Sequence, residues 1–279
     1  MAALLLNSEG AAIPMWGCVA IVGVGLMGGS LGMALKKRKL ASRVVGIDCN
    51  QSALQKGVIR EAIDEGFIEL QAVANADLIV FAAPVDVVPV LMESAAPFVS
   101  AQAVLTDLGS VKKRAVEAGE RLFGKRFLGG HPMAGSEKSG IEAAKADLFR
   151  NASWLFARPE AFDLASDPVA PKLSQTVRAL GAKPVALSTE RHDALTALVS
   201  HLPHLLTYAY SQTVEDHPYA AEAKAISAGS FRDLTRTARS DPALWNAIFH
   251  ENRVALLKSL ASLQTEIDAM KEAIENFVP

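Results

Sequence analysis

The sequence predicts an α/β fold in which a doubly wound, mostly parallel sheet is followed by an all-helical C-terminal domain. Strand-like and helix-like segments alternate through the first two-thirds of the 279 residues, a glycine-rich turn follows the first strand, and strand-like runs stop near Ser188. Alternation of this kind builds a Rossmann-type sheet with helices on both faces. A chain of this length can form two domains with separate cores. We therefore predict a Rossmann domain over residues 1–187, in which residues 1–17 are a loose extension, and a helical domain over residues 188–279.

The predicted elements follow one another along the chain. Short apolar runs, rich in β-branched residues, predict strands at residues 19–22, 44–47, 78–82, 103–106, 126–128, 154–157 and 183–187. Residues 111–122 and 168–180 carry apolar positions at helical spacing, which predicts two of the intervening helices. Beyond Ser188 the chain is rich in alanine and leucine, so we predict helices only.

The most informative local motif is Gly23-Val24-Gly25-Leu26-Met27-Gly28, which lies between the first predicted strand and a helix. The first glycine permits a tight turn, the second lets the backbone approach a pyrophosphate, and the third allows close helix packing. Unpaired N–H groups at the start of the helix can then bind the phosphates. The motif predicts a dinucleotide site formed by Gly23, Gly25, Leu26, Met27, Gly28 and Asp48.

Asp48 follows the second predicted strand, twenty residues after Gly28. A carboxylate at this place can accept hydrogen bonds from both ribose hydroxyls, which favours NAD over NADP. No arginine directly follows Asp48, and Arg43 precedes the predicted strand, so a 2′-phosphate would meet negative charge without an obvious counter-ion. The alternative is that Asp48 only caps the helix that begins at Gln51.

Charge and composition favour a small-molecule partner. The chain has 28 basic and 30 acidic side chains, and its net charge of −2 offers no basic surface for nucleic acid or anionic lipid. Residues 10–35 carry no charge, but several glycines interrupt them, so we interpret them as a strand, a turn and a helix rather than a membrane span. Cys18 and Cys49 lack metal-ligand spacing, which predicts reduced cysteines, no metal site and a cytoplasmic location.

Four further segments carry polar groups that an apolar core would not select. They are Asp107-Leu108-Gly109-Ser110-Val111-Lys112, the predicted turn Gly130-His131-Pro132, His201-Leu202-Pro203-His204 and Phe231-Arg232-Asp233-Leu234-Thr235-Arg236. Together with the glycine-rich turn, and in this order, they resemble the prephenate and arogenate dehydrogenases of tyrosine biosynthesis. The resemblance runs from about Cys18 to the C-terminus.

The resemblance implies oxidative decarboxylation of prephenate to 4-hydroxyphenylpyruvate, of arogenate to tyrosine, or of both, with NAD as the cofactor. His131 matches the family histidine that hydrogen-bonds the ring hydroxyl and takes its proton as hydride departs. Ser110 matches a serine that contacts the same hydroxyl and the histidine, and we also assign it to the cofactor site. A serine before Val111 can equally be an ordinary helix N-cap, and both roles are compatible.

The resemblance also implies residues that bind the substrate. Arg236 matches an arginine whose planar guanidinium grips a substrate carboxylate, and we favour it over Arg232 and Arg239. Glu137 and Asp233 are the acids that could face the substrate side chain, so the choice between prephenate and arogenate stays open. The predicted substrate-binding residues are His204, Arg236, Ser136, Glu137, Trp245, His192 and Asp233.

Two of these assignments have specific alternatives. His204 and His201 stand three residues apart, as two zinc ligands could, but no further ligand lies nearby in the sequence, and we interpret His201 as a packing residue. Trp245 matches a family position on the pocket floor, and it could also be a plain core residue. His192 lies with Asp193 at the family's domain junction.

The last predicted helix carries a narrow apolar seam. Its residues recur in alternating steps of four and three, as in a coiled coil, and they are Leu256, Leu260, Leu263, Ile267, Met270 and Ile274. Such a seam packs either within its own chain or across a dimer interface, and we favour a homodimer through the C-terminal helices.

Two other functions stay open from the sequence. A β-hydroxyacid dehydrogenase has a similar glycine-rich turn, but it pairs a lysine with an asparagine one helical turn later, whereas here Lys224 is followed by Ala228. A non-catalytic, dinucleotide-sensing dimer is the second alternative, and it would not need His131.

Overall fold

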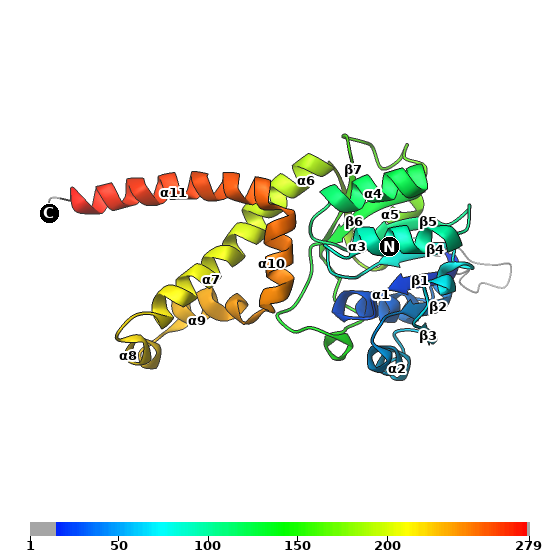
Figure 1. The fold of residues 1–279 in the computed structure, drawn as a ribbon, viewed down its shortest axis with the longest axis horizontal. Coiled ribbons are helices and arrows are strands. Elements are labelled where there is room, and N and C mark those ends of the chain that lie inside the picture. Colours follow the sequence, from blue (N-terminus) through cyan, green and yellow to red (C-terminus); the bar gives the residue numbers. More distant parts are fainter. Residues whose placement is uncertain (1–14, 278–279) are drawn as a thin grey trace. The chain divides into compact units, whose positions relative to one another are not determined.

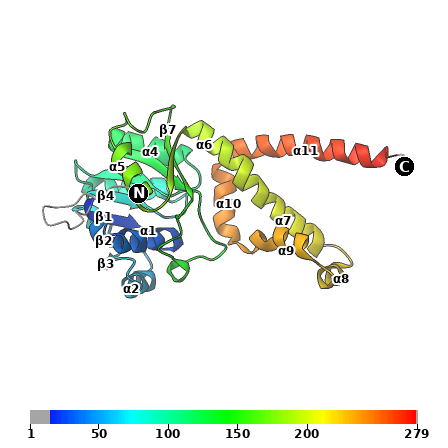
Figure 2. The same ribbon diagram turned by 180° about the vertical axis from the view of Figure 1, so that it is seen from behind.

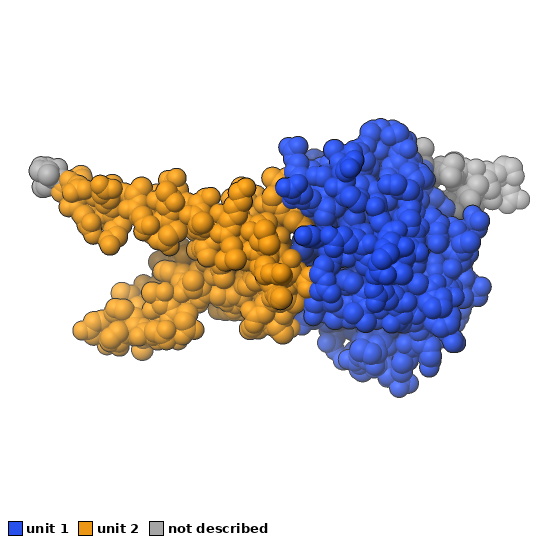
Figure 3. Space-filling model, turned by 45° about the horizontal axis from the view of Figure 1, so that its top comes forward, with its two compact units in different colours: residues 1–192 blue, residues 193–279 orange. Residues whose placement is uncertain are grey.

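The computed structural model of the protein describes residues 15–277. The chain divides into two compact units, residues 1–192 (unit 1) and residues 193–279 (unit 2), which are coloured separately in Figure 3. The predicted domain boundary after residue 187 falls within the last strand of unit 1 and stays a prediction. Residues 1–14 of the predicted N-terminal extension lie outside the described residues.

The described strands of unit 1 form one eight-stranded sheet in the order β3-β2-β1-β4-β5-β6-β7-β8 (Figure 1). All neighbouring strands are parallel except β6 and β7, which are antiparallel. This sheet confirms the predicted doubly wound, mostly parallel fold. The strands are β1 (Trp16–Val22), β2 (Ala41–Ile47), β3 (Glu65–Phe67), β4 (Leu78–Phe81), β5 (Val104–Asp107), β6 (Phe127–Pro132), β7 (Ser153–Arg158) and β8 (Lys183–Ser188).

Helices cover both faces of the sheet (Figures 1 and 2). On β4, Val80 packs in a core with apolar residues of α1 and α5, whereas its neighbour Phe81 packs in a second core with residues of α3 and α4. Successive residues of a strand point to opposite faces, so a buried sheet needs a core on each side. The helices are α1 (Leu26–Lys37), α2 (Gln51–Ile59), α3 (Val88–Ala95), α4 (Lys113–Phe123), α5 (Ala170–Ala179) and α6 (Thr189–Thr196).

Several strands of the sheet differ from the prediction. β1 begins at Trp16, inside the segment predicted to be a loose extension, because the indole of Trp16 is buried and its Nε1 donates to Thr176 Oγ1 at 3.0 Å. β3 is absent from the predicted strands, since its three residues, Glu-Gly-Phe, carry neither an apolar run nor a clear alternation. Arg43, which the sequence places before the second strand, lies within β2 and pairs with Glu65 on β3 at 2.7 Å.

Unit 2 contains helices and no strands among its described residues, as predicted. α6 continues into α7 through a π-helical segment, Ala197–His201. Pro203 has no N–H to donate to the carbonyl group of Val199, four residues earlier, so regular α-helical bonding is interrupted here. The helices that follow are α7 (Leu202–Glu215), α8 (Ala220–Ala225), α9 (Gly229–Thr235), α10 (Pro242–Glu251) and α11 (Arg253–Glu275).

Within residues 15–277, no helix is both long enough and apolar enough to span a membrane. The described part of the uncharged stretch, residues 15–35, contains β1, the glycine-rich turn and most of α1, as the sequence predicts.

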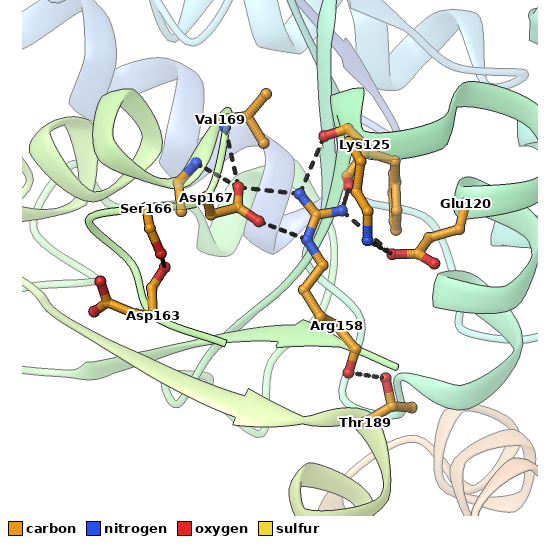
Figure 4. Close-up of polar contacts among 10 residues, drawn as sticks. Glu120, Lys125, Arg158, Asp163, Ser166, Asp167, Val169 and Thr189 are labelled. Atoms are coloured by element: carbon orange, nitrogen blue, oxygen red, sulfur yellow. Dashed lines mark hydrogen bonds and ion pairs between the residues drawn. The ribbon is translucent and has the colours of Figure 1, made fainter. Parts of the chain in front are cut away.

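Arg158, the last residue of β7, joins several elements of unit 1 (Figure 4). Its buried guanidinium makes a bidentate ion pair with Asp167, with Nε 2.8 Å from Oδ2 and Nη2 3.0 Å from Oδ1. Nη2 also donates to the carbonyl oxygen of Lys125 at 3.0 Å. Asp167 in turn accepts hydrogen bonds at 3.0 Å from the backbone N–H groups of Val169 and Ala170, where α5 begins. This cluster connects β7, the segment before β6 and the start of α5.

Replacing Asp167 by asparagine is expected to lower the free energy of unfolding by about 3 kcal/mol, because the buried guanidinium of Arg158 loses its bidentate counter-charge and retains the longer ion pair with Glu120 at 3.4 Å. Burial by itself raises the pKa of Asp167, but the hydrogen bonds from Arg158 and from the start of α5 outweigh it, and the pKa is lowered. The stabilisation is therefore fully present above the unfolded-state pKa of about 4 and is lost as the pH falls below it.

Urea denaturation of wild type and Asp167→Asn at about pH 7 and about pH 3.5 measures this effect. The difference between the two proteins should shrink at the lower pH. Asp163→Asn, at an exposed aspartate in the same segment, is the matched control and should unfold like the wild type. An equal difference at both pH values would contradict the prediction.

Candidate active site

The glycine-rich turn has the backbone geometry that a dinucleotide site requires. Gly23 has a φ of +104°, and a Cβ at Gly28 would lie 1.9 Å from the carbonyl oxygen of Gly23. Gly25 is the N-cap of α1, which Leu26 and Met27 open, and no side chain caps this end of the helix. Apart from its chain neighbours, no atom lies within 4 Å of a Cβ built on Gly25. The uncapped N–H groups are therefore open to a pyrophosphate.

Asp48 lies directly after β2, beside the glycine-rich turn. Its Oδ2 accepts a hydrogen bond from the backbone N–H of Val24 at 2.8 Å, and its Oδ1 accepts one from Asn50 at 2.8 Å. The N-cap of α2 is Asn50, whose side chain accepts from the N–H groups of Ser52 and Ala53. The alternative in which Asp48 only caps the next helix is therefore wrong, and its contact with the turn supports the cofactor assignment.

Replacing Gly25 by alanine is expected to preserve the fold and to weaken NAD binding by about 10-fold or more, which is a loss of about 1.4 kcal/mol. The added methyl group meets no protein atom outside its own neighbours, but it enters the space in which the pyrophosphate is predicted to lie. Calorimetric titration with NAD and thermal unfolding measure the two effects. Gly229→Ala, at a glycine of unit 2 that also meets nothing within 4 Å, is the control. Unchanged NAD affinity in Gly25→Ala would contradict the assignment.

His131 lies on β6, not in the turn that the sequence predicts. β7 pairs with this part of β6 in the antiparallel direction, and His131 stands opposite Leu155. Glycine has a low strand propensity, so the glycines before His131 do not predict a strand. The packing requires glycine here, because a Cβ at Gly130 would lie 2.6 Å from the carbonyl oxygen of Asp107. The His131 side chain is buried, and its Nδ1 lies 2.9 Å from Nε2 of His192, which the structure therefore brings to His131.

A buried ion pair connects the segment that contains Ser110 to the strand of His131. Asp107 and Lys112 are fully buried, and Lys112 Nζ donates to Asp107 Oδ2 and, at 2.8 Å, to the carbonyl oxygen of Gly130. Asp107 Oδ1 accepts from the N–H of Gly130 at 3.0 Å. Both backbone polar groups of the residue before His131 are thus fixed by charged partners. The sequence reasoning gave neither Asp107 nor Lys112 a role.

Ser110 lies just after β5 and is half-buried. β1, β4, β5 and β6 run parallel, so Ser110, the glycine-rich turn and the end of β6 meet at the same edge of the sheet. Ser110 does not cap α4, because that helix begins at Lys113 and its N-cap is Lys112, which makes no side-chain cap. The predicted N-cap role of Ser110 is therefore wrong.

Ser136 and Glu137 lie in an exposed segment after β6. The Ser136 hydroxyl donates to Glu137 Oε2 at 3.4 Å and accepts from the N–H of Lys138 at 3.2 Å. Further along this segment, the N–H of Lys145 donates at 2.9 Å to Oγ of Ser30 on α1. The segment with two predicted substrate-binding residues is thus attached to the helix of the predicted cofactor site.

In unit 2, the rings of His204 and Trp245 stack at a centroid distance of 3.5 Å and an angle of 9°. Burial lowers the pKa of His204 to about 4, so its imidazole is neutral near pH 7. Its Nε2 is buried and has no hydrogen-bond partner among the described residues. Leaving a buried polar atom unpaired costs about 1–3 kcal/mol, so a group of this kind suits a ligand contact. His201, interpreted as a packing residue, is fully buried, with Nδ1 3.0 Å from Nδ2 of Asn252.

Arg236 is the first residue of a 3₁₀ turn, Arg236–Arg239, that follows α9, and its side chain is exposed. Asp233 is exposed on α9, one turn earlier. The next residue, Thr237, contacts Thr207 of α7 through their hydroxyl oxygens at 3.2 Å. The turn of Arg236 is therefore fixed to the helix that carries His204. The predicted site residues are divided between the two units, with Ser110, His131 and His192 in unit 1.

The chain matches two family models. One is described as prephenate dehydrogenase, nucleotide-binding domain, and covers residues 31–167, and the other as prephenate dehydrogenase, dimerization domain, and covers residues 188–277. The prephenate dehydrogenase of Bacillus subtilis is 34% identical over 265 residues, which span 92% of this chain and 70% of that protein.

Solved structures give the same result. The crystal structure of Aquifex aeolicus prephenate dehydrogenase in complex with hydroxyphenyl propionate and NAD+ has a TM-score of 0.84 and 32% identity, covering 92% of this chain and 90% of that one. The Synechocystis arogenate dehydrogenase has a TM-score of 0.77 and 29% identity, covering 93% and 92%. These matches confirm the predicted resemblance over the alternative of a β-hydroxyacid dehydrogenase. With a nucleotide-binding domain, a helical domain and relatives that match both, the chain belongs to the prephenate dehydrogenase family.

Proposed function

We propose that the protein catalyses the NAD-dependent oxidative decarboxylation of prephenate to 4-hydroxyphenylpyruvate, of arogenate to tyrosine, or of both. The observation that carries this proposal is that His131 lies near the carboxyl end of β6, at the sheet edge that also bears the glycine-rich turn. Ligands of doubly wound sheets bind at this edge, so a proton acceptor and a dinucleotide can meet there. Family membership supplies the substrate class.

The residues of the chain divide the chemistry between them. When bound, NAD supplies the acceptor for the hydride that leaves the ring carbon bearing the hydroxyl. His131 Nε2 takes the hydroxyl proton as that C–H bond breaks and the C–O bond becomes a carbonyl, and Ser110 hydrogen-bonds the same oxygen. The ring then loses carbon dioxide, the electrons of the broken C–C bond enter the ring, and the oxygen recovers a proton from His131 as the phenol forms. Aromatisation makes the sequence effectively irreversible.

We assign one substrate carboxylate to the exposed guanidinium of Arg236. The unpaired Nε2 of neutral His204, held against Trp245, supplies a second polar contact. Glu137, Ser136 and Asp233 are proposed to face the substrate side chain, at which prephenate carries a ketone and arogenate an amine.

The test is a spectrophotometric assay of the purified chain with prephenate and with arogenate, each in the presence of NAD and of NADP. We expect reduction of NAD with at least one substrate, with one carbon dioxide released for each cofactor reduced, and slower reduction of NADP because Asp48 disfavours a 2′-phosphate. No reduction of either cofactor with either substrate would contradict the proposed function.

We also propose that the chain acts as a homodimer through its C-terminal helices. Leu256 at the start of the seam of α11 is buried, but the later residues Ile267, Met270 and Ile274 are 46%, 66% and 76% exposed in the single chain. Three large apolar side chains in one seam favour a partner helix, and the family model over this region is described as a dimerization domain. Light scattering of the full chain should report twice the mass of one chain, and a monomer would contradict the proposal.

The proposed site of action is the cytoplasm. Both cysteines of the chain, Cys18 and Cys49, carry free thiols, which is typical of proteins in reducing compartments. Fractionation of cells that produce the tagged full chain tests the location.

A further inference from the structure

We propose that His192 is a positioning residue for His131: its Nε2 accepts a hydrogen bond from Nδ1–H of His131 and thereby selects the tautomer of the catalytic base. The inference rests on the proposed function, in which His131 takes the proton of the substrate hydroxyl. The sequence leads to the expectation that His192 contacts the substrate. We propose instead that His192 contacts His131, which in turn contacts the substrate.

The two rings are placed for one specific hydrogen bond. Nδ1 of His131 lies 2.9 Å from Nε2 of His192, which is the usual length of a hydrogen bond between nitrogen atoms. The ring centroids are 5.1 Å apart and the planes are inclined by 58°, so the rings meet through these nitrogen atoms rather than by stacking. His192 is 0% exposed and His131 is 8% exposed. Water therefore has little access to the bond, and the geometry persists.

The chemistry of the base decides the direction of this hydrogen bond. A neutral imidazole carries one proton, and the nitrogen without it is the acceptor. If His192 donated to Nδ1 of His131, the proton of His131 would be on Nε2, and Nε2 could not accept another from the substrate. If His131 donates through Nδ1, then Nε2 carries the lone pair that takes the hydroxyl proton. Only the second arrangement is compatible with a general base, and it requires His192 to present an unprotonated Nε2.

The backbone holds the two histidines on the same framework. His131 is on β6, and β7 is its antiparallel neighbour. At the end of β7, the carbonyl oxygen of Arg158 accepts a hydrogen bond at 2.8 Å from the hydroxyl of Thr189, as Figure 4 shows. Thr189 is the first residue of α6, and His192 follows three residues later, on its first turn. The buried cluster of Arg158 and Asp167 therefore also fixes the start of the helix that delivers His192.

A neutral partner suits a negatively charged substrate. Catalytic bases are commonly oriented by a carboxylate, which also stabilises the imidazolium that forms. A carboxylate beside His131 would repel the carboxylates of prephenate or arogenate. An imidazole acceptor orients His131 in the same way and adds no negative charge.

The test compares two substitutions of the full chain, His192→Gln and His192→Leu. The side-chain amide oxygen of glutamine can occupy the place of Nε2 and accept the same hydrogen bond, whereas leucine cannot. We expect His192→Leu to lower kcat by about 10- to 100-fold with little change in the KM of either substrate, and His192→Gln to restore most of the loss. His250→Gln, at an exposed histidine of α10, is the control for the substitution itself. Equal loss in both variants, or a raised KM with unchanged kcat, overturns the proposal.

A second measurement separates this inference from the proposed function. Nitrogen NMR of the 15N-histidine-labelled wild type distinguishes protonated from unprotonated ring nitrogens, and His131→Asn identifies the signals of His131. We expect Nδ1 of His131 to carry the proton near neutral pH, and a proton on Nε2 instead overturns the inference even if His192→Leu does not fold. Failure of the wild type to reduce either cofactor would overturn the proposed function, whereas the NMR result would still decide the direction of the hydrogen bond.

Discussion

Replacing His131 by asparagine is expected to lower kcat by about 10²- to 10⁴-fold, which is the usual contribution of a positioned general base. Asparagine is similar in length to the first part of the imidazole and can still hydrogen-bond near His192, but it cannot accept a proton near neutral pH. The strand that carries His131 is held by Asp107 and Lys112 through Gly130, so the backbone should stay in place. The loss should therefore appear in the chemical step.

Two measurements accompany the rate of cofactor reduction in His131→Asn. NAD affinity should match that of the wild type, because the glycine-rich turn and Asp48 are separate from His131 in the sheet order. The KM of the substrate should change far less than kcat. His250→Asn provides a matched change at an exposed position. Retention of wild-type kcat would remove His131 from the chemistry.

Replacing Arg236 by glutamine is expected to raise the KM of prephenate or arogenate by about 100-fold, equivalent to about 2.7 kcal/mol, while leaving NAD affinity unchanged. A guanidinium makes two parallel, charge-assisted hydrogen bonds to a carboxylate, and the neutral amide of glutamine retains only part of one. Arg236 is exposed at the start of its 3₁₀ turn, so its removal should not affect stability. Steady-state kinetics with varied substrate at saturating NAD measure the effect.

Arg239→Gln is the matched control for Arg236. It ends the same turn, is also exposed, and has the same charge. A KM that rises in Arg239→Gln but not in Arg236→Gln would transfer the carboxylate contact to the other end of the turn. A fall in kcat without a change in KM would mean that Arg236 acts only in the transition state.

The central part of the sheet could be predicted from the sequence because its strands are apolar on both faces. Residues such as Val80 and Phe81 each meet a separate core, so the whole run reads as buried. β3 could not be found, since Glu65 and Gly66 carry no such signal and the strand exists because β2 offers it a partner. Trp16 shows the opposite case, in which tertiary burial extends β1 beyond its apolar run.

The strand of His131 shows why some site features are hidden from sequence reasoning. Glycines normally mark a turn, so the sequence predicts a turn at Gly130 and His131. In the structure both residues lie in β6, and Asp107 approaches Gly130 too closely for a side chain to fit there. Contacts between distant segments, such as His131 with His192, depend on the fold and have no counterpart in spacing along the chain.

Asp107 and Lys112 carried a signal that could have been used. Asp107 ends the apolar strand β5, and Lys112, with the opposite charge, follows five residues later, after Gly109 and Ser110. This segment lies at the edge of the sheet where ligands bind. Charged side chains are almost never fully buried unless they are paired. An aspartate and a lysine in that place therefore indicate a pair that shapes the site, although their partner at Gly130 could only be identified in three dimensions.

The π-helical segment Ala197–His201 makes the number of residues in this stretch important. Asn252 contacts a residue before this segment and the last residue within it: it donates to the carbonyl oxygen of Asp193 at 2.8 Å and lies 3.0 Å from Nδ1 of His201. An α-helix turns by about 100° per residue, so deleting one residue would rotate Asp193 away from His201 by about that angle. Asn252 could then satisfy only one of them. Exposed side chains here, such as Val199, are free to vary, but the length of the segment is not, and relatives should align across it without gaps.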